Sequence, residues 1–304
     1  MTNLTDLLAR LKSFFLIDQN TGAGSTNGAF SRLVSPENVG PYPFQTHAKG
    51  SDRYISEEIL ALGSWEPFET KIVHRLLPLY DYFLDIGANI GWYTCLAREV
   101  MAAGSHVYAF EPDPSNFALL RNNAGKSRTV RLHIERMAVS NRAGTSQLYL
   151  SSSNMGDHRL HDSEEGRLGV PVKTTTLDAY FGRRRPTSFL AKLDTQGSEP
   201  VIFDGARSLF RPDDRVSSYI VEFWPHGMAG SGADMRPYVS RLTEFGQSVF
   251  IMDHQAYRLR KTTWETLMER AESGDLMPAT QHFVDLLLVT EGSAAHAAIA
   301  DLVE

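Results

Sequence analysis

The sequence predicts an α/β fold built on a doubly wound, mostly parallel sheet. Short apolar runs alternate with segments of helical spacing along most of the chain, and the first run leads into a glycine-bearing turn that opens a helix. Hydrophobic residues make up 42% of the chain and charged residues 22%, which is an ordinary globular balance. A chain of 304 residues is therefore expected to form one α/β domain with added terminal segments.

The alternation of strands and helices defines the predicted sheet. Strands are predicted at residues 82–86, 106–110, 130–134, 189–193, 218–223, 248–252 and 284–290, about seven in all. A strand-like piece at residues 257–261 lies between the last two. Helices are predicted at residues 68–77, 90–101, 114–124, 199–209 and 264–271. This order is typical of a parallel sheet covered by helices on both faces.

We expect three segments along the chain. Residues 1–53 form an N-terminal helix and a flexible arm, residues 54–292 form the main domain, and residues 293–304 form a C-terminal helix. The first helix is indicated by an amphipathic stripe, and the arm by the Gly- and Ser-rich residues 18–29. The stripe consists of Leu4, Leu7, Leu8, Leu11, Phe14 and Phe15. It could pack against the core, a second copy in a homodimer or a carrier domain, and we expect one of the first two.

Charge and cysteine content exclude several classes of function. The net charge is −6 and the basic residues are scattered, so nucleic acid is not expected as a partner. No apolar run approaches the roughly 18 residues of a membrane span, and charges interrupt the N-terminal stripe, so we expect neither a membrane protein nor a secreted one. The single cysteine, Cys95, excludes an internal disulfide and a cysteine-based zinc cluster, which fits a reducing cytoplasm.

The turn after the first strand is the expected ligand site, because ligands of such sheets bind beyond the carboxyl ends of the strands. Gly87 allows a sharp turn, and Gly91 leaves room where the following helix is expected to pack against the sheet. A dinucleotide-binding turn would carry glycine in place of Asn89, so that the backbone approaches a pyrophosphate. Asp85 would repel a phosphate but can pair with an ammonium group. The turn therefore favours a nucleoside that carries an amino acid.

A second acid supports a nucleoside ligand. Glu111 follows the second strand, where a carboxylate can accept hydrogen bonds from both ribose hydroxyls. An NAD enzyme would place an acid at the same point, so this residue alone leaves both cofactors open.

Several segments carry a family resemblance. Residues 83–94 and 107–114 hold the two motifs just described, and residues 138–140, 176–178, 191–199 and 205–206 follow in order. In sequence and approximate spacing they resemble the FkbM family of S-adenosylmethionine-dependent methyltransferases, over roughly residues 54–252. The resemblance implies a Rossmann-like class I methyltransferase fold for the domain at residues 54–292, and S-adenosylmethionine as its cofactor. The segment that begins at Asp194 departs mildly from the family pattern, which does not threaten cofactor binding.

The resemblance also implies the cofactor-binding residues. The methionine part is expected against Asp85, Gly87, Asn89 and Gly91, the ribose against Glu111, and the adenine against Met137 and Ala138. The predicted cofactor site further includes Ala88, Thr94, Pro112 and Asp194. Glu66 is expected to close over the methionine end or simply to begin the helix that follows it.

Methyl transfer to a hydroxyl needs an aligned acceptor and a base. Asp194 is the first candidate for the base and Glu222 the second, with Lys192 as a partner for these carboxylates. His158 is a third candidate, in a long polar loop at residues 151–169 that is expected to shape the site. The structural alternatives are a helix cap for Asp194 and a solvent-exposed position for His158.

No metal ion is expected. Asp157, His158, Asp194 and Glu222 offer suitable ligand atoms, but they form no compact ligand motif, and methyl transfer does not require an ion.

The sequence thus predicts a methyltransferase that acts on a hydroxyl of a small-molecule acceptor, such as a natural product or a sugar. N-methylation by the same fold stays open. So do an NAD-dependent oxidoreductase and a module that binds a cofactor without catalysis.

Overall fold

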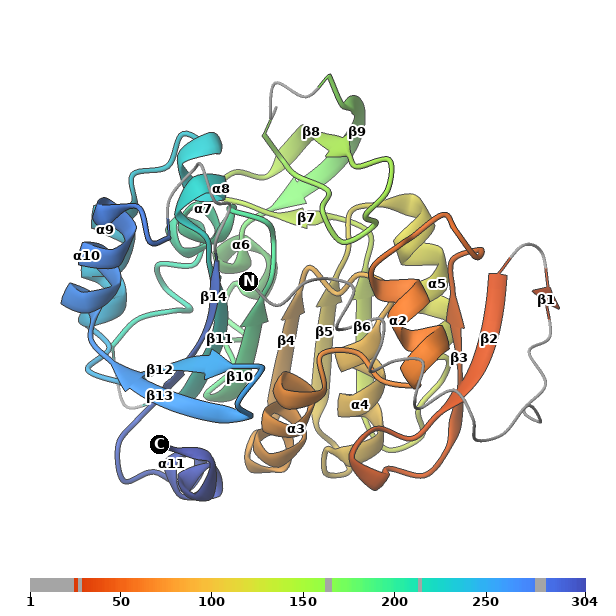
Figure 1. The fold of residues 1–304 in the computed structure, drawn as a ribbon, viewed down its shortest axis with the longest axis horizontal. Coiled ribbons are helices and arrows are strands. Elements are labelled where there is room, and N and C mark those ends of the chain that lie inside the picture. The colour runs from red at the N-terminus through yellow and green to blue at the C-terminus, as the bar shows by residue number, and fades with distance from the viewer. Residues whose placement is uncertain (1–24, 27–28, 162–165, 213–214, 277–282) are drawn as a thin grey trace.

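Eight strands form the central sheet, in the order β13-β12-β14-β11-β10-β4-β5-β6 (Figure 1). The computed structural model describes residues 25–26, 29–161, 166–212, 215–276 and 283–304. The strands are β4 (Tyr82–Ile86), β5 (His106–Phe110), β6 (Arg131–Glu135), β10 (Ser188–Leu193), β11 (Val216–Phe223), β12 (Ser248–Asp253), β13 (Arg258–Thr262) and β14 (Val284–Val289). The predicted α/β class is confirmed.

The predicted count of seven strands is corrected to eight. The strand-like piece at residues 257–261 turns back and pairs with β12 as the edge strand β13. The five strands β4, β5, β6, β10 and β11 are mutually parallel, whereas β14 runs antiparallel to both of its neighbours. The prediction of a mostly parallel sheet is therefore confirmed.

The order of the strands reverses beside β4. The chain lays down β4, β5 and β6 toward one edge, then crosses to β10 and β11 on the other side of β4. A ligand is expected beyond the carboxyl ends of β4 and β10, because the connections diverge there and leave a crevice.

Helices cover both faces of the sheet, and each face has its own hydrophobic core. Adjacent residues of β4 enter different cores: Phe83 packs with α2, α3 and α4, and Leu84 packs with α6, α7, α9 and α10. The helices are α2 (Ile55–Leu62), α3 (Pro67–Leu76), α4 (Trp92–Val100), α5 (Pro114–Ala124), α6 (Leu177–Phe181), α7 (Glu199–Asp204), α8 (Pro225–Gly230), α9 (Met235–Thr243), α10 (Trp264–Ser273) and α11 (Ala294–Ala298). None of these helices is long and apolar enough to cross a bilayer.

Part of the predicted arm is packed onto the domain. The strands β2 (Ala29–Val34) and β3 (Tyr42–Thr46) form a small antiparallel sheet with β1 (Ser25–Thr26). Phe44 of β3 is fully buried, edge-on to Trp92 of α4 with the ring centroids 5.4 Å apart. The helix predicted near the N-terminus lies outside the described residues. The helix predicted at residues 293–304 is shorter, since α11 ends at Ala298 and a single 3₁₀ turn follows. The boundaries of the three segments stay a prediction.

A third sheet carries the long polar loop. It consists of β7 (Ala138–Val139), β9 (Leu168–Thr175) and β8 (Gly144–Leu150), and it lies beyond the carboxyl ends of β4, β5 and β6 (Figure 1). The strands on either side of the loop, β8 and β9, pair with each other in this sheet.

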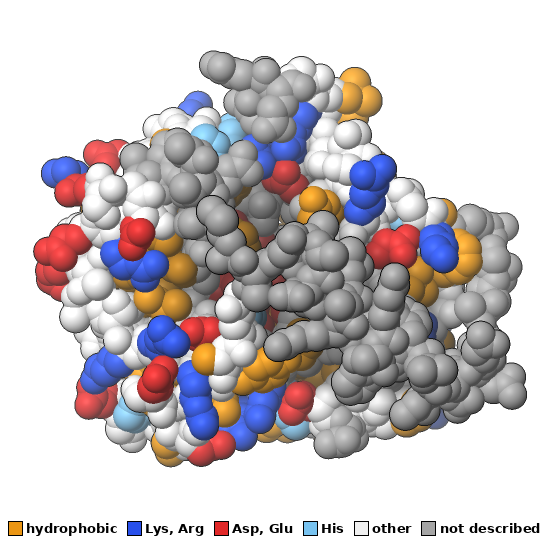
Figure 2. All heavy atoms as spheres, viewed as in Figure 1, with side chains coloured by type: hydrophobic (Ala, Val, Ile, Leu, Met, Phe, Trp, Pro, Cys, Tyr) orange, Lys and Arg blue, Asp and Glu red, His pale blue; other side chains and the backbone are white. Residues whose placement is uncertain are grey.

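Figure 2 shows acidic and basic side chains interspersed on the described part of one face, with no large area of one sign there.

Candidate active site

The turn from β4 into α4 depends on two glycines. Gly87 has φ of +85°, and a Cβ atom there would lie 2.0 Å from the carbonyl oxygen of Asp194. Gly91 has φ of +91°, and its Cβ would lie 2.7 Å from Cδ1 of Leu120. Gly91 thus lets α4 approach α5, and not the sheet as predicted. Gly87 leaves room for the backbone after β10, so the ends of β4 and β10 meet closely.

Glu111 is held rigidly beside this turn. It is 5% exposed, its Oε2 accepts a hydrogen bond from the backbone N–H of Asn89 at 2.9 Å, and its Oε1 accepts one from the N–H of Asp113 at 2.8 Å. Burial raises the pKa of this carboxyl to about 8. A preorganised buried carboxyl is well suited to accept hydrogen bonds from ligand hydroxyls, because its desolvation has already occurred.

A cavity opens at the reversal point and collects much of the predicted site. Its lining includes eight of the predicted residues: Gly87, Asn89, Glu111, Pro112, Met137, Ala138, His158 and Asp194. Residues that were not predicted also line it, among them Asn116, Leu148, Met155, Leu160 and Gln196. Several of these come from the small sheet and its loop, which therefore form one wall of the cavity, as predicted for the loop.

Other predicted residues lie behind the cavity. Asp85 is 1% exposed, and its Oδ2 accepts a hydrogen bond from the hydroxyl of Thr94 at 2.5 Å. Burial raises the pKa of Asp85 to about 6. Ala88 and Gly91 are likewise absent from the cavity lining. These four residues support the turn from within the domain, and their direct contact with a cofactor stays a prediction.

Lys192 joins two acids next to the cavity. Its Nζ lies 3.1 Å from Oδ2 of Asp194 and 3.1 Å from Oε1 of Glu69, and 4.8 Å from the ring centre of Tyr93. Burial alone would lower its pKa, but Asp194 and Glu69 raise it well above the usual value, so the ammonium stays charged. The tyrosine hydroxyl in turn donates to Oε2 of Glu66 at 2.7 Å. Glu66 therefore lies at this cluster and does not line the cavity.

Asp194 and Glu222 share one amide. The Nε2 of Gln196 donates to Oδ1 of Asp194 at 3.0 Å and to Oε1 of Glu222 at 3.3 Å. Glu222 is 6% exposed, and its Oε2 has no hydrogen-bond partner among the described residues. Burial, together with the charge of Asp194, raises the pKa of Glu222 well above its usual value. The structure thus brings together the two acids predicted for catalysis, and Asp194 bonds side chains here instead of capping a helix.

The geometry of His158 does not suit a base. Its Nδ1 accepts a hydrogen bond from the backbone N–H of Ser151 at 3.0 Å, so in the neutral ring Nε2 carries the proton. Burial lowers the pKa of His158, which keeps it neutral. The adjacent acid, Asp157, could orient the ring but instead pairs with Arg159 at 2.6 Å and Arg167 at 2.7 Å. His158 has no free lone pair for proton abstraction and faces the cavity as a donor.

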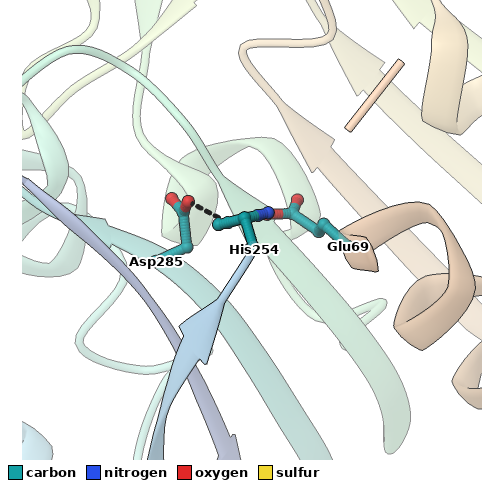
Figure 3. Close-up of side chains that lie close together, drawn as sticks. All are labelled: Glu69, His254 and Asp285. Carbon is teal, nitrogen blue, oxygen red and sulfur yellow. Dashed lines mark hydrogen bonds and ion pairs between the residues drawn. The ribbon is translucent and has the colours of Figure 1, made fainter. Parts of the chain in front are cut away.

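Three further residues lie near Lys192, at the edge of the central sheet where the parallel strands end, and they were not predicted. His254 follows β12, Asp285 lies in β14 and Glu69 lies in the first turn of α3 (Figure 3). Nε2 of His254 lies 2.8 Å from Oδ2 of Asp285, and this hydrogen bond raises the pKa of the imidazole to about 9 although burial alone would lower it. Asp285 reaches this edge because β14 is reversed, and the sequence gives no sign of that direction.

Carboxyl groups outnumber basic side chains at the carboxyl edge of the sheet. Among the described residues of this cluster, five acids lie near two basic side chains, Lys192 and His254. The acids are Glu66, Glu69, Asp194, Glu222 and Asp285. An edge of this kind complements a ligand that carries positive charge, as the sulfonium and ammonium of S-adenosylmethionine do. Together with the preorganised Glu111, it meets the chemical requirements of that cofactor.

An α/β sheet with a nucleoside-suited crevice at its reversal point defines a Rossmann-like cofactor-binding protein. The profile of the family described as "Methyltransferase FkbM domain" matches residues 85–258, more than half of the chain. The chain therefore belongs to the FkbM methyltransferase family.

One curated relative and two solved structures show how far the similarity extends. The 31-O-demethyl-FK506 methyltransferase FkbM of Streptomyces tacrolimicus is 41% identical over 119 residues, which are 39% of this chain and 45% of that protein. The match thus spans less than half of the relative.

The structure of methyltransferase FkbM from Methylobacillus flagellatus KT has 12% identity and a TM-score of 0.39, and the match covers 68% of this chain and 43% of that one. The O-methyltransferase from Bacillus cereus in complex with SAH has 12% identity and a TM-score of 0.38, with 77% and 90% covered. Likeness at this level carries no functional conclusion.

Proposed function

We propose that the enzyme methylates a hydroxyl group of a small-molecule acceptor bound at the carboxyl ends of β10 and β11. The observation that carries this proposal is the pair of acids Asp194 and Glu222, joined through Gln196 beside the cofactor cavity. A hydroxyl must lose its proton as it attacks, so a carboxylate base next to the methyl group favours an oxygen acceptor. The curated relative, named for a 31-O-demethyl substrate, supports an oxygen acceptor in a natural product.

Each side chain has a part in this reaction. Bound S-adenosylmethionine supplies an activated methyl group. Asp194 takes the proton from the acceptor hydroxyl, and the ammonium of Lys192, 3.1 Å from Oδ2, holds that carboxylate in position. Glu222 shares the amide of Gln196 with Asp194 and helps to position the acceptor beside that base. Glu111 binds the ribose and fixes the cofactor relative to these groups.

The test is a methyl-transfer assay with hydroxyl and amine acceptors. Asp194→Asn is expected to lower kcat by about 100-fold, the usual scale for a lost base, with little change in the affinity for S-adenosylhomocysteine. Asp204→Asn is the matched control, since Asp204 is about half exposed and pairs with Arg207 on the surface. A kcat at the wild-type level in Asp194→Asn would remove the base, and transfer to amines alone would favour N-methylation.

Three further expectations concern the location of the protein, its dimerisation and the alternative cofactor. A cytoplasmic location is supported by the buried free thiol of Cys95, which suits a reducing compartment. A homodimer through the N-terminal helix concerns residues outside the described part of the chain. NADH binding in a calorimeter, with no binding of S-adenosylhomocysteine, would favour the oxidoreductase that Asn89 argues against.

A further inference from the structure

Glu69, His254 and Asp285 place three metal-ligating atoms close together. One carboxylate oxygen or ring nitrogen from each lies within 4.8 Å of the other two (Figure 3). The side chain of Glu69 is 1% exposed, that of Asp285 15% and that of His254 36%, so the cluster is buried on one side and accessible on the other. The three residues come from α3, the end of β12 and the start of β14.

A neighbouring acid provides a second, independent observation that points to a bound cation. Glu222 lies directly opposite Asp285 in the pairing of β11 with β14. Side chains of directly paired residues point to the same face, so the buried and unpartnered Oε2 of Glu222 lies beside the cluster. Unsatisfied buried oxygens are costly, and a cation near this point would offset the excess of carboxylates.

We propose that Glu69, His254 and Asp285 bind a divalent transition-metal ion. One imidazole and two carboxylates suit Zn²⁺, Mn²⁺ or Co²⁺ better than Mg²⁺ or Ca²⁺, which prefer oxygen ligands alone. Three protein ligands leave coordination positions open, as in catalytic metal sites. On binding, the imidazole releases its proton to solvent, and Lys192 keeps its second partner, Asp194.

The site adjoins the acceptor end of the active site. Lys192 contacts both Glu69 and Asp194, so one side chain separates the metal ligands from the proposed base. An acceptor oxygen in an open coordination position becomes more acidic, which assists its deprotonation.

This inference reverses the expectation of no metal. The ligand set weighed from the sequence is not assembled, because Asp157 pairs with Arg159 and Arg167. Metal binding itself does not depend on the nature of the methyl acceptor.

The test titrates Co²⁺ into the chelator-treated full chain and follows both heat and the visible d–d absorption of the ion. The wild type is expected to bind one equivalent, with a spectrum that shows coordination by the protein. His254→Ala and Asp285→Asn are expected to weaken binding by at least about 10-fold. Glu272→Gln is the matched control. It removes an exposed acid of α10 that pairs with Arg236 of α9, and this variant should bind Co²⁺ as the wild type does.

Two outcomes would overturn the site. One is the absence of saturable Co²⁺ binding by the wild type, and the other is unchanged affinity in both variants. Circular dichroism shows whether each variant is folded. If a variant is not folded, His254→Gln is used in its place, since it also removes the imidazole ligand. Cobalt binding is measured without cofactor or acceptor. The metal proposal and the hydroxyl proposal can therefore fail independently of each other.

Discussion

At the scale of single residues, the proposed chemistry depends on buried carboxyl groups. Glu111 and Asp85 both lie at strand ends, yet their surroundings differ. Glu111 faces the cofactor cavity, whereas Asp85 lies behind it and bonds Thr94. The two acids are therefore expected to respond differently to substitution.

Glu111→Ala is expected to weaken binding of S-adenosylhomocysteine by about 1–3 kcal/mol, the usual cost of leaving buried hydrogen-bonding groups without their partner. Isothermal titration calorimetry measures the change. Glu135→Ala is the matched control, because Glu135 ends the next strand, β6, and bonds the hydroxyl of Tyr180 outside the cavity. An effect of Glu111→Ala on the acceptor KM alone would place this acid elsewhere in the reaction.

Asp85 gives the protein a pH-dependent stability. Its folded pKa of about 6 exceeds its ordinary value of 3.8, so the folded state holds the proton more tightly than the unfolded state. Stability therefore falls as the pH rises from about 4 to 6, and a cost of about 3 kcal/mol persists above that range.

Asp85→Asn removes this cost. Its free energy of unfolding, relative to the wild type, is expected to rise by about 3 kcal/mol between pH 4 and pH 7. Urea denaturation of both proteins at several pH values measures this difference, in which other titrating groups cancel. A difference that is flat with pH would show that burial does not perturb Asp85.

The sequence allows prediction of residues whose roles are local. Asn89 and Glu111 were found because turn chemistry and position at a strand end are visible within a few residues. His254 and Asp285 were missed, because their meeting depends on a reversed strand distant in the chain from Glu69. The sequence also suggests His158 as a base, but its hydrogen bond to Ser151, which is visible only in the folded chain, argues against that role.

At the scale of elements, the turn between β4 and α4 is tightly constrained at Gly87 and Gly91. Strands and helices near it were predicted closely, since their hydrophobic patterns are regular and their ends are marked by Gly, Asp or Pro. The edge strand β13 and the small β7-β9-β8 sheet were harder to predict, because periodicity does not reveal which strands pair.

Gly87→Ala tests this constraint. The new Cβ would collide with the carbonyl oxygen of Asp194 at a residue of positive φ, so we expect a loss of roughly 3 kcal/mol or more in the free energy of unfolding. Gly104→Ala is the matched control: its φ is +93°, but a Cβ there has nothing within 4 Å. It should lose only about 1–2 kcal/mol. Equal losses, measured by urea denaturation, would show that backbone conformation alone explains both glycines.

At the scale of the whole molecule, the reversal of strand order brings the proposed cofactor and acceptor sites to one edge. Glu111 and the turn after β4 lie on one side of the reversal, and Asp194, Glu222 and the metal-ligating cluster lie on the other. The methyl group is therefore expected to lie near the junction of β4 and β10, and the position of the cofactor is the claim on which the other assignments depend.

A crystal structure of the enzyme with S-adenosylhomocysteine tests this claim most directly. The ribose hydroxyls are expected within hydrogen-bond distance of the Glu111 carboxylate, with the sulfur atom turned toward Asp194. A ligand bound away from the carboxyl ends of β4 and β5, or one whose ribose makes no contact with Glu111, would contradict it.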